Sequence, residues 1–168
     1  LLPFDINKLS IEESEWVKKI EDIRNELRSS VKEIEVVNYG AGSPDSELTT
    51  DEMFKGRVSQ EIVSQISHAS VPFKYGLLLF KIIRNFKPNN SLELGTCLGI
   101  STSYLASALE INNKGKLITI EGAPSLSLIA KENFEKLGLK RVRTEIGRFQ
   151  DVLDDILKEI KTVDYTFI

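Results

Sequence analysis

The sequence predicts an α/β domain built as a doubly wound parallel sheet, preceded by a helical segment. The first observation is the stretch Ser91–Ser103, where an apolar strand leads into a loop with Gly95 and Gly99 and then into a helix. The second is the alternation of apolar, β-branched segments with amphipathic ones throughout residues 71–168. A strand, a glycine loop and a helix in this order are typical of a nucleotide-binding turn, and right-handed crossovers place helices on both faces of such a sheet.

Composition and charge narrow the classes of protein. The 168 residues are 41% hydrophobic and 28% charged, as in an ordinary globular domain, and the net charge of −3 provides no basic surface for nucleic acid or an anionic membrane. No apolar run approaches the ~20 residues of a membrane-spanning helix. Cys97 is the single cysteine, so an internal disulfide is excluded, and we expect a reducing, cytoplasmic location.

Residues 1–70 are expected to form a helical cap in front of the domain of residues 71–168. Ser10 and Glu13 have the spacing of a capping box, in which each side chain accepts a hydrogen bond from the other residue's backbone N–H at the start of a helix. The apolar stripe of this helix follows at helical spacing: Trp16, Ile20, Ile23 and Leu27.

The rest of the cap is predicted as a loop and a second helix. Val36–Asp51 is polar and rich in turn residues, namely Gly40, Gly42, Ser43 and Pro44. Thr49–Glu52 could cap the second helix, whose expected apolar stripe is Val58, Ile62 and Ile66. His68, the only histidine, follows in a polar connector and is expected on the surface.

In the domain of residues 71–168, helices and strands are predicted to alternate. Pro72 begins a helix that is apolar nearly all round and should be buried against the sheet. The later elements are a strand ending near Leu94, a helix from about Ser101 to Leu109, a strand Lys116–Glu121, a helix Pro124–Leu137, a strand Val142–Ile146, a helix capped by Asp151 and a fourth strand from Thr162.

The glycine loop departs from the dinucleotide fingerprint Gly-x-Gly-x-x-Gly, because three residues separate Gly95 from Gly99. Glu93 lies two residues before the loop and is expected to place a negative charge at its mouth. A carboxylate there would repel a phosphate and would suit a ligand that carries an ammonium or a sulfonium group. Cys97 is interpreted as a small filler, since no base lies near it in the sequence.

Glu93-Leu94-Gly95-Thr96-Cys97-Leu98-Gly99-Ile100-Ser101 resembles motif I of the class I S-adenosylmethionine-dependent methyltransferases. It is most similar to the bacterial small-molecule O-methyltransferases related to catechol O-methyltransferase. The resemblance implies a Rossmann-like sheet with strand order 3-2-1-4 and S-adenosylmethionine as the cofactor. It also implies in-line methyl transfer to the hydroxyl of a small molecule. The cofactor would then be held by the loop and helix start, with Glu93 near its methionine end: Gly95, Thr96, Gly99 and Ser101.

Further cofactor contacts are expected at two other strand ends. Glu121 ends the second strand, where an acidic side chain can accept hydrogen bonds from both ribose hydroxyls, and this position matches motif II of the methyltransferases. An NAD site would also carry an acid there, so Glu121 indicates an adenosine ligand. In the resembling enzymes the turn after the third strand closes over the adenine, which implies contacts from Gly147, Phe149 and Gln150.

No catalytic residue and no metal ligand are assigned within this sequence. In the catechol-like enzymes the first metal-binding Asp directly follows the fourth strand, which here means the position after Ile168. A divalent metal such as Mg²⁺ would therefore be bound by residues beyond Ile168. Because the chain stops inside an apolar strand, we expect the domain to continue past its C-terminal residue.

Two rival functions remain open at this point. An NAD-dependent oxidoreductase is disfavoured by the missing fingerprint and by Glu93, and a non-catalytic binding or assembly module could retain the same fold. In the resembling enzymes the helices before the first strand help to cover the substrate, so residues 1–70 are a candidate lid. A scaffold or a homodimer contact is the alternative for the same helices.

Overall fold

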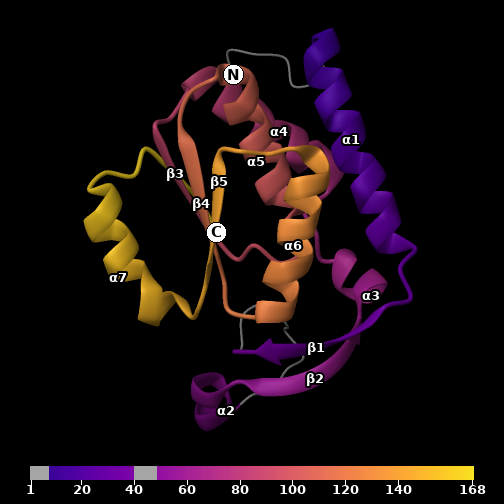
Figure 1. Cartoon of the computed structure of the whole chain (residues 1–168), viewed down its shortest axis with the longest axis vertical. Helices are drawn as coiled ribbons and strands as arrows, with labels where there is room; N and C mark the ends of the chain where they lie inside the picture. Colours follow the sequence, from indigo (N-terminus) through magenta and orange to yellow (C-terminus); the bar gives the residue numbers. More distant parts are fainter. Residues whose placement is uncertain (1–7, 40–48) are drawn as a thin grey trace.

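The computed structural model describes residues 8–39 and 49–168, and its centre is a four-stranded parallel sheet in the order β5-β4-β3-β6 (Figure 1). This confirms the predicted order 3-2-1-4. The strands are β3 (Asn90–Leu94), β4 (Lys116–Glu121), β5 (Val142–Ile146) and β6 (Tyr165–Phe167). The chain adds β4 and then β5 on one side of β3, and β6 pairs on the other side of β3. Folds of this kind bind ligands at the carboxyl ends of the strands where the order switches sides, here β3 and β6.

Helices cover both faces of the sheet, as Figure 1 shows. The helices α4 (Phe73–Phe86), α5 (Ile100–Asn112) and α6 (Pro124–Leu137) pack on one face, and α7 (Phe149–Ile160) packs on the other. The strands serve both layers because their side chains alternate. Leu92 and Ile118 pack with α7, whereas Glu93 and Thr119 point to the opposite face, beneath α5.

The N-terminal helix α1 (Ile11–Arg28) begins with the predicted capping box. The Glu13 backbone N–H donates to Ser10 Oγ at 3.2 Å, and the Ser10 N–H donates to Glu13 Oε2 at 3.0 Å. The same Glu13 carboxylate accepts from Lys81 Nζ at 2.7 Å and from Arg84 Nε at 3.0 Å, both on α4. A largely buried ion pair therefore fixes α1 against the helical layer of the domain.

The remainder of the N-terminal region differs from the prediction, because it contains an antiparallel hairpin. Its strands are β1 (Glu33–Asn38) and β2 (Arg57–Ile62), and two short helices flank the second strand, α2 (Thr50–Lys55) and α3 (Val63–Ser67). The predicted loop was therefore wrong for Val36–Asn38, and the predicted helical stripe of Val58, Ile62 and Ile66 was wrong too. These residues are four positions apart, but Val58 and Ile62 belong to strand β2 and Ile66 belongs to helix α3. The turn residues Gly40 to Pro44 lie outside the described residues.

The hairpin lies at the carboxyl end of the parallel strands, below α6 in Figure 1. The Ser125 hydroxyl at the start of α6 donates to the Glu35 carbonyl on β1 at 2.6 Å. The hairpin is thus placed against the edge of the sheet at which β3 and β4 end. None of the helices in the described part of the chain is long and apolar enough to cross a membrane.

Candidate functional site

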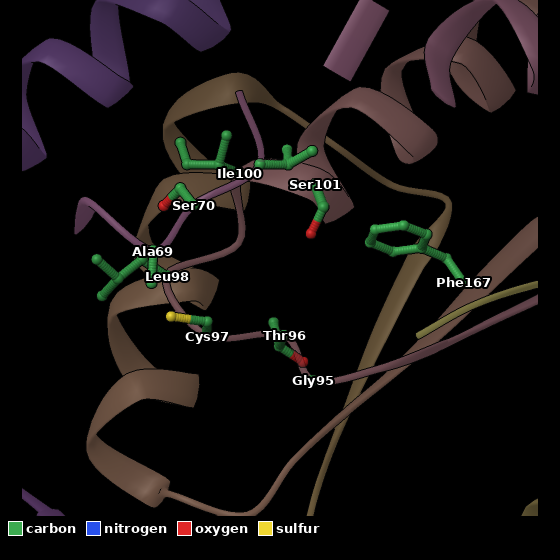
Figure 2. A pocket seen from close by; sticks show the side chains of 10 residues that line it. Ala69, Ser70, Gly95, Thr96, Cys97, Leu98, Ile100, Ser101 and Phe167 are labelled. Atoms are coloured by element: carbon green, nitrogen blue, oxygen red, sulfur yellow. The ribbon is translucent and has the colours of Figure 1, made fainter. Parts of the chain in front are cut away.

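Two neighbouring cavities open at the carboxyl edge of the sheet. The smaller, of about 260 Å³, is shown in Figure 2: the Ser101 side chain points into a space bordered by Thr96 and Phe167. The larger, of about 830 Å³, lies between the hairpin, the end of β4 and the start of α7. Gly95, Cys97 and Ala69 border both cavities, so the glycine loop and the connector after α3 form the wall that the two spaces share.

The two loop glycines have different roles. Gly95 has φ +97°, and a Cβ atom built on it would meet nothing within 4 Å, so its α-carbon faces open space where a ligand can approach the backbone. Gly99 has φ +83° and precedes α5, and a Cβ atom there would lie 2.6 Å from the Phe134 ring of α6. Gly95 therefore serves the cavities, whereas Gly99 allows α5 and α6 to pack closely.

The sequence predicted Glu93 at the mouth of the loop, but its side chain is fully buried. Its Oε2 accepts hydrogen bonds from the hydroxyls of Thr102 at 2.5 Å and Thr119 at 2.7 Å, and Thr119 is in turn 2.6 Å from the Thr96 hydroxyl. Burial raises the pKa of Glu93 above its ordinary value, and the hydroxyl donors only partly offset this effect. Because β3 alternates Leu92, Glu93 and Leu94, the carboxyl group points under α5.

Glu121 lies at the end of β4 and borders the larger cavity. Its carboxylate accepts the backbone N–H of Cys97 at 2.7 Å and that of Ala123 at 2.9 Å, so it connects the glycine loop to the turn after β4. Each carboxylate oxygen has two lone pairs, and one on each remains for a ligand hydroxyl. The predicted position at the strand tip is confirmed, and its partner there remains a prediction.

The turn after β5 places Phe149 and Gln150 on the larger cavity. Arg148, rather than Asp151, is the N-cap residue of α7, so Phe149 and Gln150 belong to the first helical turn. The assignment of Asp151 as the cap was therefore wrong. Gly147 borders neither cavity, and a Cβ atom on it would lie 2.6 Å from Val152, so its lack of a side chain serves packing.

Comparison with known proteins identifies the family. A sequence model described as O-methyltransferase matches residues 45–168, which is more than half of the chain. The chain belongs to the O-methyltransferase family. Catechol O-methyltransferase of Niastella koreensis is 35% identical over 91 residues, which cover 54% of this chain and 40% of that protein. Bovine catechol O-methyltransferase is 27% identical over 154 residues, covering 87% of this chain and 53% of that protein.

The chain thus spans about half the length of the curated relatives it matches. Among solved structures, an O-methyltransferase from Bacillus cereus in complex with SAH matches with a TM-score of 0.53 at 20% identity, over 100% of this chain and 56% of that one. A methyltransferase of Podospora anserina bound to SAH matches with a TM-score of 0.50 at 23% identity, over 53% of this chain and 38% of that one. At these identities the likeness concerns the fold.

In this member of the O-methyltransferase family, the predicted site residues divide into three groups. Thr96 and Ser101 border the smaller cavity, and Gly95 borders both. The larger cavity is bordered by Glu121, Phe149 and Gln150. The residues that border neither cavity are Glu93, Gly99 and Gly147.

Sequence reasoning proposed residues 1–70 as a lid but named none of the N-terminal residues that border the larger cavity. Tyr39, which follows β1, and Met53 of α2 border it together with Arg148 from the turn after β5. The alternation of Ile34, Val36 and the residues between them could have indicated a strand there, but which end of the domain it covers depends on long-range packing.

The other predictions about reactive side chains concern Cys97 and His68. Burial, together with the negative charge of Glu121, raises the pKa of the Cys97 thiol to about 11, so the thiol is protonated at neutral pH. This agrees with its interpretation as a filler. His68 is exposed after α3, as predicted. Within residues 8–39 and 49–168, no group of three or more His, Cys, Asp and Glu side chains could hold a metal ion.

Proposed function

We propose that this chain holds the S-adenosylmethionine site of a methyltransferase that methylates a hydroxyl group of a small molecule. The observation that carries the proposal is the position of Glu121. Its carboxylate lies at the end of β4 and borders the same cavity as Gly95 and Phe149, in a chain of the O-methyltransferase family. The activity and the substrate belong to the whole protein, because the matched part of this chain covers only 40% and 53% of the two catechol O-methyltransferases.

The residues present fit an adenosine ligand with a cationic, amino-acid-like tail. The larger cavity has a volume of about 830 Å³, which lies within the usual range of ~300–1,000 Å³ for small-molecule sites. Glu121 could accept hydrogen bonds from the ribose hydroxyls, while Phe149 and Gln150 contact the adenine. The tail could then extend past Gly95, where the backbone is open, towards Thr96 and Ser101 in the smaller cavity.

The bound sulfonium would supply an electrophilic methyl group. The chain's own residues would hold the donor so that an acceptor oxygen approaches in line, and would exclude water from the site. The network of Glu93, Thr119 and Thr96 would keep the glycine loop in one conformation while the ligand binds. We assign no residue of this chain to the removal of the acceptor proton.

The alternatives are less well supported. An NAD-dependent oxidoreductase would need the Gly-x-Gly-x-x-Gly loop, which the chain lacks, and the family match gives no support to it. A non-catalytic module on this fold would lack cofactor affinity, and the experiment below tests that. A divalent metal bound beyond Ile168, a homodimer, a lid formed by residues 1–70 and a cytoplasmic location stay predictions.

Calorimetric titration with S-adenosylmethionine, S-adenosylhomocysteine and NAD tests the proposal. We expect the first two to bind and NAD not to bind. Glu121→Gln should weaken binding at least tenfold, because one carboxylate oxygen is lost as an acceptor. Glu145→Gln is the matched control, since Glu145 lies on the adjacent strand β5 and borders neither cavity. Binding of NAD alone, or of none of the three by the folded wild-type protein, would contradict the proposal.

A further inference from the structure

Tyr39 of the N-terminal segment lies beside Gly122, the residue that follows the proposed ribose contact Glu121. Its ring is placed between two glycines that come from different parts of the chain. A Cβ atom on Gly56 would lie 2.8 Å from Tyr39 Cε1, and one on Gly122 would lie 3.0 Å from Cδ2, which is on the opposite edge of the ring. Gly122 directly follows Glu121. The two glycines therefore form a slot that holds the Tyr39 ring beside the end of β4.

Arg148 provides a third contact to this ring. Its guanidinium carbon lies 5.9 Å from the centre of the Tyr39 ring and 4.9 Å from that of Phe54, distances typical of cation–π contacts. Arg148 Nη1 also donates to the Phe54 carbonyl at 2.5 Å, and its Nε and Nη2 donate to the Asp151 carboxylate at 2.5 Å and 2.9 Å. The guanidinium is thus held by α7 and rests against two aromatic rings of the N-terminal segment.

These side chains face the same space as the proposed nucleoside contacts. Tyr39, Gly122 and Arg148 border the larger cavity together with Glu121 and Phe149. Arg148 directly precedes Phe149 in the sequence, so the same turn carries the contact to Tyr39 and the expected contact to adenine. Tyr39 itself lies before residue 45, where the match to the family begins. The wall that it forms is therefore not part of what that match covers.

We propose that Tyr39 is a binding residue for the nucleoside half of the cofactor, and that Arg148 is the residue that positions it. The ring edge lies against the turn that follows Glu121, so a ribose held by Glu121 would have the Tyr39 ring as its neighbour on the hairpin side. Tyr39 borders the same cavity as Glu121 and does not border the smaller cavity proposed for the tail, so its expected contact is with the nucleoside half. The inference rests on the proposed function, because it takes Glu121 as the ribose contact.

The test uses calorimetry with S-adenosylhomocysteine and with adenosine, which contains the nucleoside half alone. Tyr39→Ala should weaken the binding of both ligands roughly tenfold, because the nucleoside loses the apolar ring that lies beside its ribose. Tyr39→Phe should bind within about twofold of the wild-type protein, because the ring is retained. Tyr75→Ala is the matched control, since Tyr75 is 62% exposed on α4 and borders neither cavity.

The positioning role of Arg148 is tested by a double variant, because a general loss of stability would also weaken binding in the single variant. Arg148→Ala alone should weaken the binding of adenosine severalfold. Combined with Tyr39→Ala it should add little, because a residue that acts through Tyr39 has no further effect once the ring is gone. Arg143→Ala is its control: Arg143 pairs with Glu145 and Glu159 away from the cavity. Additive losses in the double variant would overturn the positioning role of Arg148.

The outcomes separate this inference from the proposed function. If the wild-type protein binds neither S-adenosylhomocysteine nor adenosine, the proposed function fails. If it binds both, and Tyr39→Ala binds them within twofold of the wild-type affinity, the function stands and the role of Tyr39 is refuted. Should Tyr39→Ala fail to fold, Tyr39→Leu keeps most of the packing volume without the aromatic ring, and the same tenfold loss is expected. Unchanged binding by Tyr39→Leu would then refute the role.

Discussion

The hydroxyl of Thr119 on β4 donates a hydrogen bond of 2.7 Å to the carboxyl group of Glu93 on β3, in a part of the core that solvent does not reach. The Thr96 hydroxyl of the glycine loop is 2.6 Å from the same Thr119 oxygen, and Thr102 of α5 donates to Glu93 at 2.5 Å. One carboxyl group therefore joins two strands, the loop and the helix that follows it.

The first prediction concerns the ionisation of this carboxyl group. Because burial raises the pKa of Glu93, the folded state holds its proton more tightly than the unfolded state does. The contribution of Glu93 to the free energy of unfolding is therefore fully present below the ordinary glutamate pKa and is lost as the pH rises through the folded-state pKa. Glu93→Gln, which cannot ionise, should gain stability relative to the wild-type protein as the pH rises. Urea unfolding from pH 4 to pH 8 measures this difference.

Asp164→Asn provides a control of opposite sign. The Asp164 carboxylate accepts the backbone N–H groups of Asn90 and Asn89, and these bonds hold its pKa below the ordinary value. Its contribution is present above the unfolded-state pKa and is lost as the pH falls through the lower folded-state pKa, so this variant is compared with the wild-type protein from about pH 2 to pH 5, where it should lose relative stability as the pH rises. A Glu93→Gln difference that is flat, or that falls with rising pH, would show that Glu93 is not held in its neutral form.

The second prediction concerns the close approach of α5 and α6 at Gly99. Gly99→Ala should lower the free energy of unfolding by about 2–4 kcal/mol, since it combines a strained positive φ with a contact of 2.6 Å to the Phe134 ring. Gly138→Ala is the matched control: Gly138 has φ +72°, and a Cβ atom there would meet nothing within 4 Å. We expect a loss of about 1–2 kcal/mol from its backbone strain alone. Equal losses in chemical unfolding would contradict the packing role of Gly99.

The third prediction compares two ion pairs that hold α1. Glu13 pairs with Lys81 where both side chains are only 9% exposed, whereas Glu26 pairs with Lys136 in solvent. Glu13→Gln should lower the free energy of unfolding by about 3 kcal/mol, because it leaves a buried ammonium without its counter-charge. Glu26→Gln should cost less than about 1 kcal/mol. If thermal or urea unfolding finds the two losses alike, the Glu13 pair does not anchor α1.

How far the sequence predicted this structure depends on how local each signal was. The sheet order and the position of Glu121 were predictable, because apolar strands, the glycine loop and strand ends are short patterns. The direction of Glu93 was missed, although its place between Leu92 and Leu94 requires it to point away from the face that those leucines share.

The hairpin could not be predicted in the same way. Val58, Ile62 and Ile66 have helical spacing by coincidence, because they span the end of β2 and the start of α3. Whether such a segment is strand or helix is decided by its pairing with β1, which is distant in the sequence. The Tyr39 contact with Gly122 follows from that pairing and has no local signature.

The most direct test of the cofactor site is a crystal structure of the protein grown with S-adenosylhomocysteine. Our proposal predicts the ribose hydroxyls within hydrogen-bond distance of the Glu121 carboxylate and the adenine beside Phe149, with the tail passing Gly95. Ligand density on another surface, or a nucleoside placed away from Glu121, would contradict it.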